Sequence, residues 1–252
     1  MKVIVSDIHG RTDWQKHVNL CLKSPIDDLH IIFIGDYVDS FHIDPQLILE
    51  NLKVIIGLKK KHPNKVTLLL GNHDYAYMFE LSQISGYNHI FAPQYKKLFS
   101  DNWGLFDLAY GFGTFDWRKR SYQDYTLITH AGLTDYFFYW HILDAIKNKE
   151  NTMHHLLGKT YKQYSLHEVI NFFKDKRNQM WIVGYNRGGY YPSGSILWAD
   201  MDELIKNPFK NINQIVGHTS QKVNITVMKD DKNFIYFTDN SGIDSTGILN
   251  LI

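Results

Sequence analysis

The sequence predicts an α/β fold with two β-sheets, and two patterns in the chain carry this prediction. Residues 1–74 alternate short apolar runs with helical stretches in the order β-α-β-α-β, joined by short loops. This alternation is typical of a parallel sheet covered by helices. Later in the chain, the runs at 223–228 and 234–238 flank a polar turn at 229–233. They predict a hairpin and therefore a second, partly antiparallel sheet.

The elements of the first 74 residues follow from simple strand and helix signals. Apolar runs predict strands at 3–5, 31–34 and 66–70. A capping-box pattern from Thr12 to Gln15 predicts a helix that continues to about residue 22. An Asp-Pro pair at 44–45 predicts the start of a second helix, whose apolar stripe ends before residue 62.

The rest of the chain is less regular. We expect a helix over 75–84, and mostly helical structure over 134–180. β-Branched runs at 125–129 and 213–216 predict two more strands. The aromatic residues scattered between 103 and 125 are expected to pack in the core rather than to form a substrate platform.

Length and composition favour one globular domain over residues 1–252. The chain is 44% hydrophobic and 21% charged, which is an ordinary composition for a protein with a sizeable core. We find no low-complexity run, internal repeat or linker-like stretch that would divide it. The net charge of +1 gives no reason to expect nucleic acid or an anionic membrane as a partner.

The single cysteine, Cys21, excludes a disulfide within the chain and fits a reducing compartment. The first residues lead directly into a strand, and no apolar stretch reaches the length of about 18 residues that a membrane helix needs. We therefore expect a cytoplasmic protein without membrane insertion.

Ligand-type side chains follow several of the predicted strands at the point where each strand ends. The three strands of residues 1–74 are each followed by a pair of such residues: Asp7 and His9, Asp36 and Asp39, and Asn72 and His73. Two later strands are each followed by a single histidine, His130 and His218. One such residue alone is more often an ordinary loop residue than a ligand. Because the carboxyl ends of parallel strands share one edge of a sheet, five instances together predict a common site.

The side-chain types of these residues indicate that the site binds a metal ion. Carboxylate, imidazole and amide oxygen without thiolate favour Mn, Fe or Zn, whereas Mg is less suited to several imidazoles. Asp36 lies on the middle strand and could bridge two divalent ions about 3.5–4 Å apart. Water held between two such ions becomes acidic enough to supply hydroxide as a nucleophile at phosphorus.

These residues and their order resemble the calcineurin-like metallophosphoesterase superfamily. Its signature is Asp-x-His, Gly-Asp-x-x-Asp, Gly-Asn-His-Asp/Glu and two later His motifs, and this sequence carries matching motifs at 7–9, 35–39, 71–74, 130–132 and 217–218. The resemblance spans almost the whole chain. It implies a four-layer α/β/β/α sandwich of two mixed sheets, with a dinuclear metal site at their common edge.

The resemblance also implies roles for single residues. The first ion would be held by Asp7, His9 and Asp36, and the second by Asp36, Asn72, His130 and His218. His73 resembles the family's general acid, with Asp39 as its partner carboxylate. In an extended segment, the side chain of His73 would point away from that of Asn72. Asn72 and His73 are also expected to contact the substrate phosphate.

Two features point to a branch of the superfamily. The lone His218 in Gly-His-Thr and the segment 194–200, which ends in Leu-Trp-Ala-Asp, resemble the phosphoprotein phosphatase branch and its diadenosine tetraphosphatase relatives. That branch usually has Arg-Gly after the second Asp of its Gly-Asp-x-x-Asp motif, but here Ser40 follows Asp39. Arg187, in a glycine-flanked loop, is the best replacement for that phosphate-binding guanidinium. The alternative is that Arg187 is a solvated loop cation.

The sequence therefore predicts a metal-dependent phosphoesterase with Mn as the expected metal and Fe or Zn as alternatives. We expect serine/threonine phosphoproteins as substrates. Dinucleoside polyphosphates of the diadenosine tetraphosphate type are the alternative, and small phosphomonoesters are further candidates. A module that keeps the fold but has lost catalysis is a weaker alternative, because every ligand and the acid are present.

Overall fold

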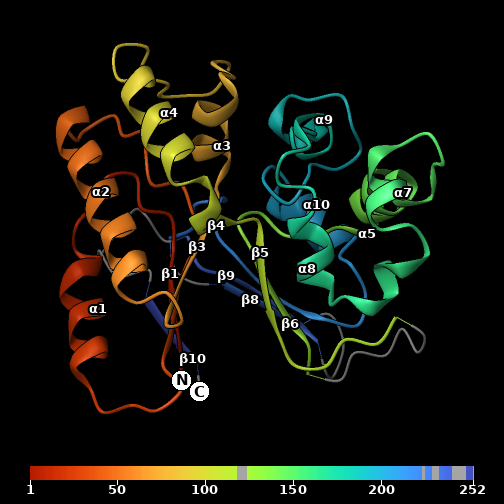
Figure 1. Cartoon of the computed structure of the whole chain (residues 1–252), viewed down its shortest axis with the longest axis horizontal. Helices are drawn as coiled ribbons and strands as arrows, with labels where there is room; N and C mark the ends of the chain where they lie inside the picture. The colour runs from red at the N-terminus through yellow and green to blue at the C-terminus, as the bar shows by residue number, and fades with distance from the viewer. Residues whose placement is uncertain (118–123, 223–224, 229–232, 240–247, 252) are drawn as a thin grey trace. The chain divides into compact units, whose positions relative to one another are not determined.

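The computed structural model describes residues 1–117, 124–222, 225–228, 233–239 and 248–251. These residues form two compact units. Unit 1 contains the described residues within Met1–Asp107, Ser220–Asn224 and Thr238–Ile252, and unit 2 those within Leu108–Thr219 and Ile225–Phe237. Each unit holds one sheet (Figure 1). The expectation of a single catalytic domain over 1–252 stays a prediction.

Unit 1 is built, in its described part, on a mixed sheet with the strand order β10-β1-β2-β3-β4. Strands β1 to β4 are parallel, and β10 is antiparallel to β1. This arrangement confirms the predicted parallel sheet, whereas β4 and β10 were not predicted. The strands are β1 Lys2–Val5, β2 His30–Phe33, β3 Val66–Leu69, β4 Phe106–Asp107 and β10 Ile248–Leu251.

The helices of unit 1 include the crossovers that connect its parallel strands. They are α1 Trp14–Lys23, α2 Pro45–Lys61, α3 Asn72–Phe79 and α4 Ala92–Asp101, followed by a 3₁₀ turn over Trp103–Leu105. Helices α1 and α2 follow β1 and β2, and α3 packs against α4 (Figure 1). Ile4, Ile32 and Leu68 are completely buried, as expected for parallel strands covered on both faces.

Two of the predicted helix starts need correction. Helix α1 begins after Asp13 and has no side-chain cap, so the capping box expected at Thr12 is wrong. The side chain of Gln15 instead donates a hydrogen bond to Asn51. Helix α3 already begins at Asn72 and ends at Phe79, so the helix predicted over 75–84 was placed too late.

Unit 2 contains a second mixed sheet, which has the order β5-β6-β7-β9-β8 among the described residues. Strands β6, β7 and β9 are parallel, whereas β5 and β8 are antiparallel to their neighbours. The predicted α/β class with two mixed sheets is therefore confirmed. The turn expected at 229–233 lies outside the described residues except for Asn233. The strands are β5 Ala109–Phe112, β6 Thr126–Thr129, β7 Asn213–Val216, β8 Ile225–Met228 and β9 Phe234–Phe237.

The connection between β6 and β7 is largely helical, as predicted, but it consists of short pieces. They are α5 Asp135–Phe137, a π-helix over Phe138–Leu143, α6 Asp144–Lys147, α7 Thr152–Leu156, a 3₁₀ helix over Gly158–Gln163, α8 Leu166–Asn171, α9 Arg177–Met180, a 3₁₀ turn over Tyr185–Arg187 and α10 Met201–Lys206. Leu204 of α10 packs with Val216 and Phe237 in one buried cluster.

The aromatic residues between 103 and 125 pack against other rings where the structure describes them. In unit 1, Trp103 contacts Tyr75 with ring centroids 6.4 Å apart. In unit 2, Trp117 stacks on Phe138 at 5.8 Å. These contacts agree with the expected packing role, and residues 118–123 lie outside the described part.

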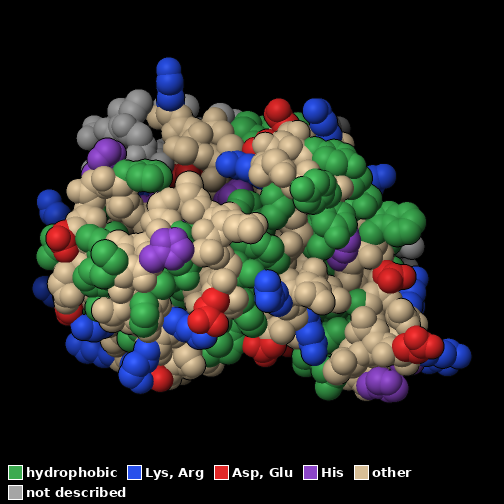
Figure 2. Space-filling model, turned by 90° about the horizontal axis from the view of Figure 1, so that it is seen from above, with side chains coloured by type: hydrophobic (Ala, Val, Ile, Leu, Met, Phe, Trp, Pro, Cys, Tyr) green, Lys and Arg blue, Asp and Glu red, His purple; other side chains and the backbone are tan. Residues whose placement is uncertain are grey.

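The surface and the helices of the described chain show how charge and hydrophobicity are distributed. On the face drawn in Figure 2, acidic and basic side chains are interspersed among the described residues, without a large patch of one sign. Within the described residues, no helix combines the length and the hydrophobicity needed to span a membrane.

Candidate metal centre

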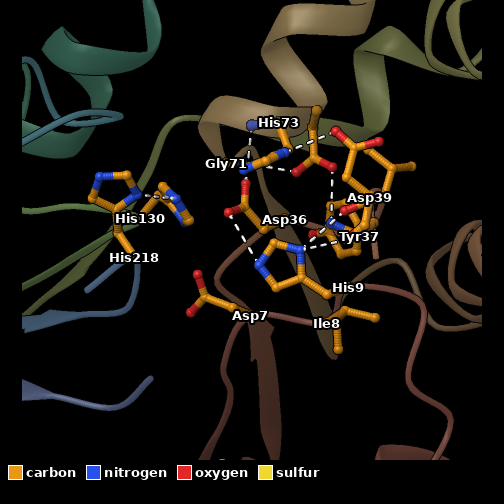
Figure 3. A network of polar contacts seen from close by, with 12 residues as sticks. Asp7, Ile8, His9, Asp36, Tyr37, Asp39, Gly71, His73, His130 and His218 are labelled. Carbon is orange, nitrogen blue, oxygen red and sulfur yellow. Dashed lines mark hydrogen bonds and ion pairs between the residues drawn. The ribbon is translucent and has the colours of Figure 1, made fainter. Parts of the chain in front are cut away.

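The predicted ligands of unit 1 lie where three parallel strands end. Val5 pairs with Phe33 and Phe33 pairs with Leu68, so β1, β2 and β3 deliver the following residues to the same edge of the sheet. The loops after β1 and β2 are then joined by backbone hydrogen bonds. The N–H of His9 donates to the carbonyl oxygen of Asp36 at 2.6 Å. Figure 3 shows the side chains of unit 1 that lie at this edge, among them Asp7, His9 and Asp36.

Two glycines of the motifs allow the loops after β2 and β3 to approach closely. A Cβ atom at Gly35 would lie 2.3 Å from the backbone nitrogen of Gly71, and Gly35 has a positive φ of 111°. A Cβ atom at Gly71 would lie 2.0 Å from Oδ1 of Asp36. Any other residue would push the backbone of one loop away from the other. The glycine in each motif is therefore needed to bring Asp36 beside the start of α3.

Several candidate site residues have a left-handed backbone. His9, Asp36 and Asp39 have φ values of 43°, 50° and 63°, and His218 in unit 2 has a φ of 66°. A positive φ is uncommon for residues other than glycine, and such strain clusters at functional sites. Of the eight non-glycine residues with a positive φ in the described part of the chain, four are thus candidate site residues.

One ligand atom each from Asp7, His9 and Asp36 lies within 4.8 Å of the others. Both carboxylates are buried, and Nε2 of His9 is 3.6 Å from Oδ2 of Asp36. Nδ1 of His9 is 2.8 Å from the carbonyl oxygen of Asp39, so it carries the proton and leaves Nε2 as the lone-pair donor. Two buried carboxylates and an imidazole oriented in this way fit a divalent cation.

A second pair of candidate ligands lies in unit 2. His130 and His218 follow the parallel strands β6 and β7, and the N–H of Gly217 donates to the carbonyl oxygen of His130 at 2.8 Å. Nε2 of His130 lies 3.1 Å from Nδ1 of His218. Two ring nitrogens at this distance can share a proton or bind one cation. The edge of Trp198 packs on His218 with ring centroids 5.9 Å apart. The other ligands predicted for the second ion, Asp36 and Asn72, belong to unit 1.

His73 and Asp39, which were predicted to act as general acid and partner carboxylate, are in direct contact. Nδ1 of His73 lies 2.8 Å from Oδ2 of Asp39, and both side chains are largely buried. Burial by itself lowers the pKa of His73. The charge of Asp36, the hydrogen bond and charge of Asp39 and the charge of Asp74 together outweigh burial and raise that pKa to about 9. At neutral pH the ring is therefore protonated, with Nε2–H able to donate a proton.

Two residues around this pair were not predicted to take part. The carboxylate of Asp74 accepts hydrogen bonds from the N–H groups of Tyr37 at 2.8 Å and Gly71 at 2.9 Å, so it ties the loops after β2 and β3 together. Burial and then the charge of Asp36 raise the pKa of Asp74 well above its ordinary value. The hydroxyl of Tyr77 donates to Oδ1 of Asp39.

The sequence contained a partial signal for both residues. Asp74 closes the Gly-Asn-His-Asp motif. Tyr77 follows His73 by four positions, a spacing that places two residues on one face of a helix. This signal is visible only when the helix begins at Asn72, whereas the sequence predicts a start at residue 75.

Arg187 is held by two polar contacts in unit 2. Its Nε atom lies 2.9 Å from Oδ2 of Asp200, and Nη2 donates to the hydroxyl of Thr219 at 2.7 Å. The guanidinium is therefore paired with Asp200 and hydrogen-bonded to Thr219, the residue after His218, rather than being a freely solvated loop cation. Its binding of substrate phosphate stays a prediction.

Comparison with known proteins identifies related sequences. A family model described as calcineurin-like phosphoesterase matches residues 3–233. A putative serine/threonine-protein phosphatase of Schizosaccharomyces pombe is 34% identical over 71 residues, which is 28% of this chain and 22% of that protein. The serine/threonine-protein phosphatase PP1-1 of Saccharomyces cerevisiae is 32% identical over 84 residues, 33% of this chain and 25% of that protein. The chain thus matches about a quarter or less of the length of these relatives.

Solved structures with some similarity include two phosphatases. A serine/threonine phosphatase from Saccharomyces cerevisiae, with similarity to human phosphatase PP5, aligns over 98% of this chain and 69% of its own, with 16% identity and a TM-score of 0.49. A cold-active protein-tyrosine phosphatase from a Shewanella species aligns over 93% of this chain and 70% of its own, with 18% identity and a TM-score of 0.47.

The family match is the finding that decides the classification. It begins in β1, ends just before β9 and includes all the motifs found in the sequence. The resemblance stated from those motifs is therefore confirmed, and with it the class of metallophosphoesterases. This chain belongs to the calcineurin-like phosphoesterase family.

Proposed function

We propose that this protein is a metal-dependent phosphatase that removes phosphate from serine and threonine side chains of proteins. The observation that carries the proposal is the His73 and Asp39 pair next to the candidate ligands Asp7, His9 and Asp36, because a ring that can donate a proton then lies close to residues that could hold a cation. The names of the two curated relatives support a protein substrate.

The proposed cofactor is a pair of divalent ions, with Mn as the first choice and Fe or Zn as alternatives. Asp7, His9 and Asp36 would hold one ion, and Asp36, Asn72, His130 and His218 the other. The donor set of carboxylates, imidazoles and an amide supports this choice of metals. When bound, such ions would polarise the phosphate and acidify a water molecule.

The remaining roles belong to side chains of the chain itself. His73 would protonate the leaving alkoxide through Nε2, while Asp39 orients the ring through Nδ1. Asn72, His73 and Arg187 would contact the phosphate oxygens. A cytoplasmic location, expected from the single cysteine, completes the proposal.

The experiment is a hydrolysis panel with Mn-loaded protein. The substrates are one peptide carrying phosphoserine, phosphothreonine or phosphotyrosine at the same position, diadenosine tetraphosphate, and nitrophenyl phosphate as monoester and diester. We expect kcat/KM to be highest for the phosphoserine or phosphothreonine peptide. The matched control is Asp36→Asn, assayed with the same metal, since contaminating phosphatases would not respond to this change.

Each alternative substrate class gives a different result in this panel. A higher kcat/KM for diadenosine tetraphosphate than for the peptides would replace the protein substrate by a nucleotide. A preference for phosphotyrosine would reject the serine/threonine assignment. If no substrate is hydrolysed although two ions bind, the protein is a metal-binding module without phosphatase activity.

A further inference from the structure

The hydroxyl of Tyr77 is in contact with the carboxylate that orients His73. It donates to Oδ1 of Asp39 and accepts a hydrogen bond from the backbone N–H of Asn88 at 2.7 Å. An amide N–H can only donate, and a phenol has a single proton. The proton of Tyr77 is therefore directed at Asp39 and is not available to another acceptor.

Asp39 is consequently held from both sides. Its Oδ2 atom lies 2.8 Å from Nδ1 of His73, and its Oδ1 atom accepts from Tyr77. The side chain of Asp39 is 3% exposed, so water cannot readily replace either partner. A carboxylate with a donor on each oxygen cannot rotate without losing a charge-assisted hydrogen bond.

The ring of Tyr77 is itself fixed by neighbours. It stacks on Tyr87 with centroids 4.4 Å apart and an angle of 10°, and Tyr95 packs edge-on at 5.0 Å. The side chain of Asn88 accepts from the N–H of Phe91 at 3.0 Å, just before α4 begins. The segment between α3 and α4 thus determines where the hydroxyl points.

From these contacts we propose that Tyr77 is a positioning residue for the general acid. By holding Asp39 in one orientation, it keeps Nδ1 of His73 engaged, so that Nε2–H faces the leaving group. Tyr77 acts only through Asp39. The inference rests on the proposed phosphatase function, in which His73 donates the proton.

The decisive variant is Tyr77→Phe, because it removes the hydroxyl and keeps the stacked ring. The matched control is Tyr95→Phe. Tyr95 is also buried, packs in the same ring cluster and donates its hydroxyl to a protein acceptor, the carbonyl oxygen of Pro45 at 2.9 Å. Tyr95→Phe therefore reproduces the loss of a buried hydrogen bond without touching Asp39.

At matched Mn loading, Tyr77→Phe should lower kcat for a phosphoserine peptide by roughly 10-fold, a part of the roughly 10²–10⁴ that a general acid supplies. It should lower kcat for nitrophenyl phosphate less than about 2-fold, since that leaving group needs little protonation. Tyr95→Phe should change kcat for the phosphoserine peptide and kcat for nitrophenyl phosphate by the same factor. Equal losses on both substrates in Tyr77→Phe would overturn the proposal.

A second readout does not depend on activity. In metal-free protein, the Nδ1 proton of His73 should give a strongly shifted NMR signal, which moves in Tyr77→Phe and stays in Tyr95→Phe. This signal tests the positioning of His73 even when the wild type hydrolyses no phosphoester, so failure of the inference and of the proposed function can be told apart. An unchanged signal in Tyr77→Phe would overturn the inference.

If Tyr77→Phe does not fold, the hydroxyl can be strengthened instead of removed. Replacement of Tyr77 by 3,5-difluorotyrosine makes the phenol a better donor and keeps the ring. The Nδ1 proton signal of His73 should then shift in the direction opposite to the shift expected when the hydrogen bond between Tyr77 and Asp39 is lost. No shift would mean that Tyr77 does not act on His73.

Discussion

The backbone N–H of His73 donates a hydrogen bond to Oδ1 of Asp36 at 3.1 Å. The carboxylate of Asp36 thus lies at the N-terminus of α3, where backbone N–H groups stabilise negative charge. Asn72 and His73 are consecutive residues of a helix rather than of the extended segment expected from the sequence. Consecutive helical side chains point about 100° apart, so Asn72 and His73 can still serve different partners.

The first prediction separates the acid from a metal ligand. His73→Asn should leave the metal content unchanged and lower kcat for alkyl phosphates by roughly 10²–10⁴, whereas aryl phosphates with acidic leaving groups should lose much less. The reason is that an alkoxide needs a proton to depart and a nitrophenolate does not. A series of alkyl and aryl phosphates measures this dependence, with His62→Asn at the end of α2 as control. Equal losses across the series, or loss of an ion, would contradict the assignment.

The second prediction concerns Asp36 as the carboxylate shared by two ions. Asp36→Asn keeps the size of the side chain but removes its charge, so both the metal content and the activity should fall severely. Elemental analysis of purified protein counts the ions. Asp101→Asn is the control, because Asp101 is an exposed carboxylate paired with Lys97 at 2.8 Å. A variant that still binds about two ions and turns over normally would show that Asp36 does not bridge them.

The third prediction tests Arg187. Arg187→Ala should weaken inhibition by phosphate or vanadate by roughly 1.5–3 kcal/mol, the range for a lost charge-assisted contact. The metal content should stay the same. Arg177→Ala, at an exposed position in the same unit, controls for the lost positive charge. Unchanged inhibition constants would leave Arg187 with only its structural contacts to Asp200 and Thr219.

The parts of the site that could be predicted are those that depend on residues close together in the sequence. Each of β1, β2 and β3 is a largely apolar run followed within three residues by a ligand-type side chain, so strand positions and ligand positions could be inferred together. Gly35 and Gly71 were visible as parts of the motifs. Their physical reason, the contact between two loops that leaves no room for a Cβ atom, depends on residues far apart in the chain.

The parts that could not be predicted depend on where elements begin and on distant partners. Tyr77 reaches Asp39 only because α3 starts at Asn72, and the polar Asn-His-Asp sequence hid that start. The pairing of Arg187 with Asp200 joins the end of a 3₁₀ turn to the N-cap residue of α10, which no periodic pattern reveals. Strand β10 adds to the sheet beside β1 from the far end of the chain.

The last prediction follows from the raised pKa of His73. Burial lowers this pKa, but the charges of Asp36, Asp39 and Asp74 and the hydrogen bond to Asp39 raise it to about 9, from an ordinary value of 6.5. Because the pKa of His73 is higher in the folded state than in the unfolded state, proton binding to His73 stabilises the folded protein. This stabilisation is fully present below pH 6.5 and is lost as the pH rises through about 9. The difference between the folded-state pKa of His73 and its ordinary value corresponds to roughly 3 kcal/mol in the free energy of unfolding.

Denaturant unfolding of EDTA-treated protein between about pH 6 and 10 measures this contribution. Wild type should lose more stability than His73→Gln over this range, and His62→Gln should behave like wild type. Parallel curves for wild type and His73→Gln would contradict the prediction. Added Mn should move the loss to lower pH, because cations bound by Asp36 would balance the charge that helps to keep His73 protonated.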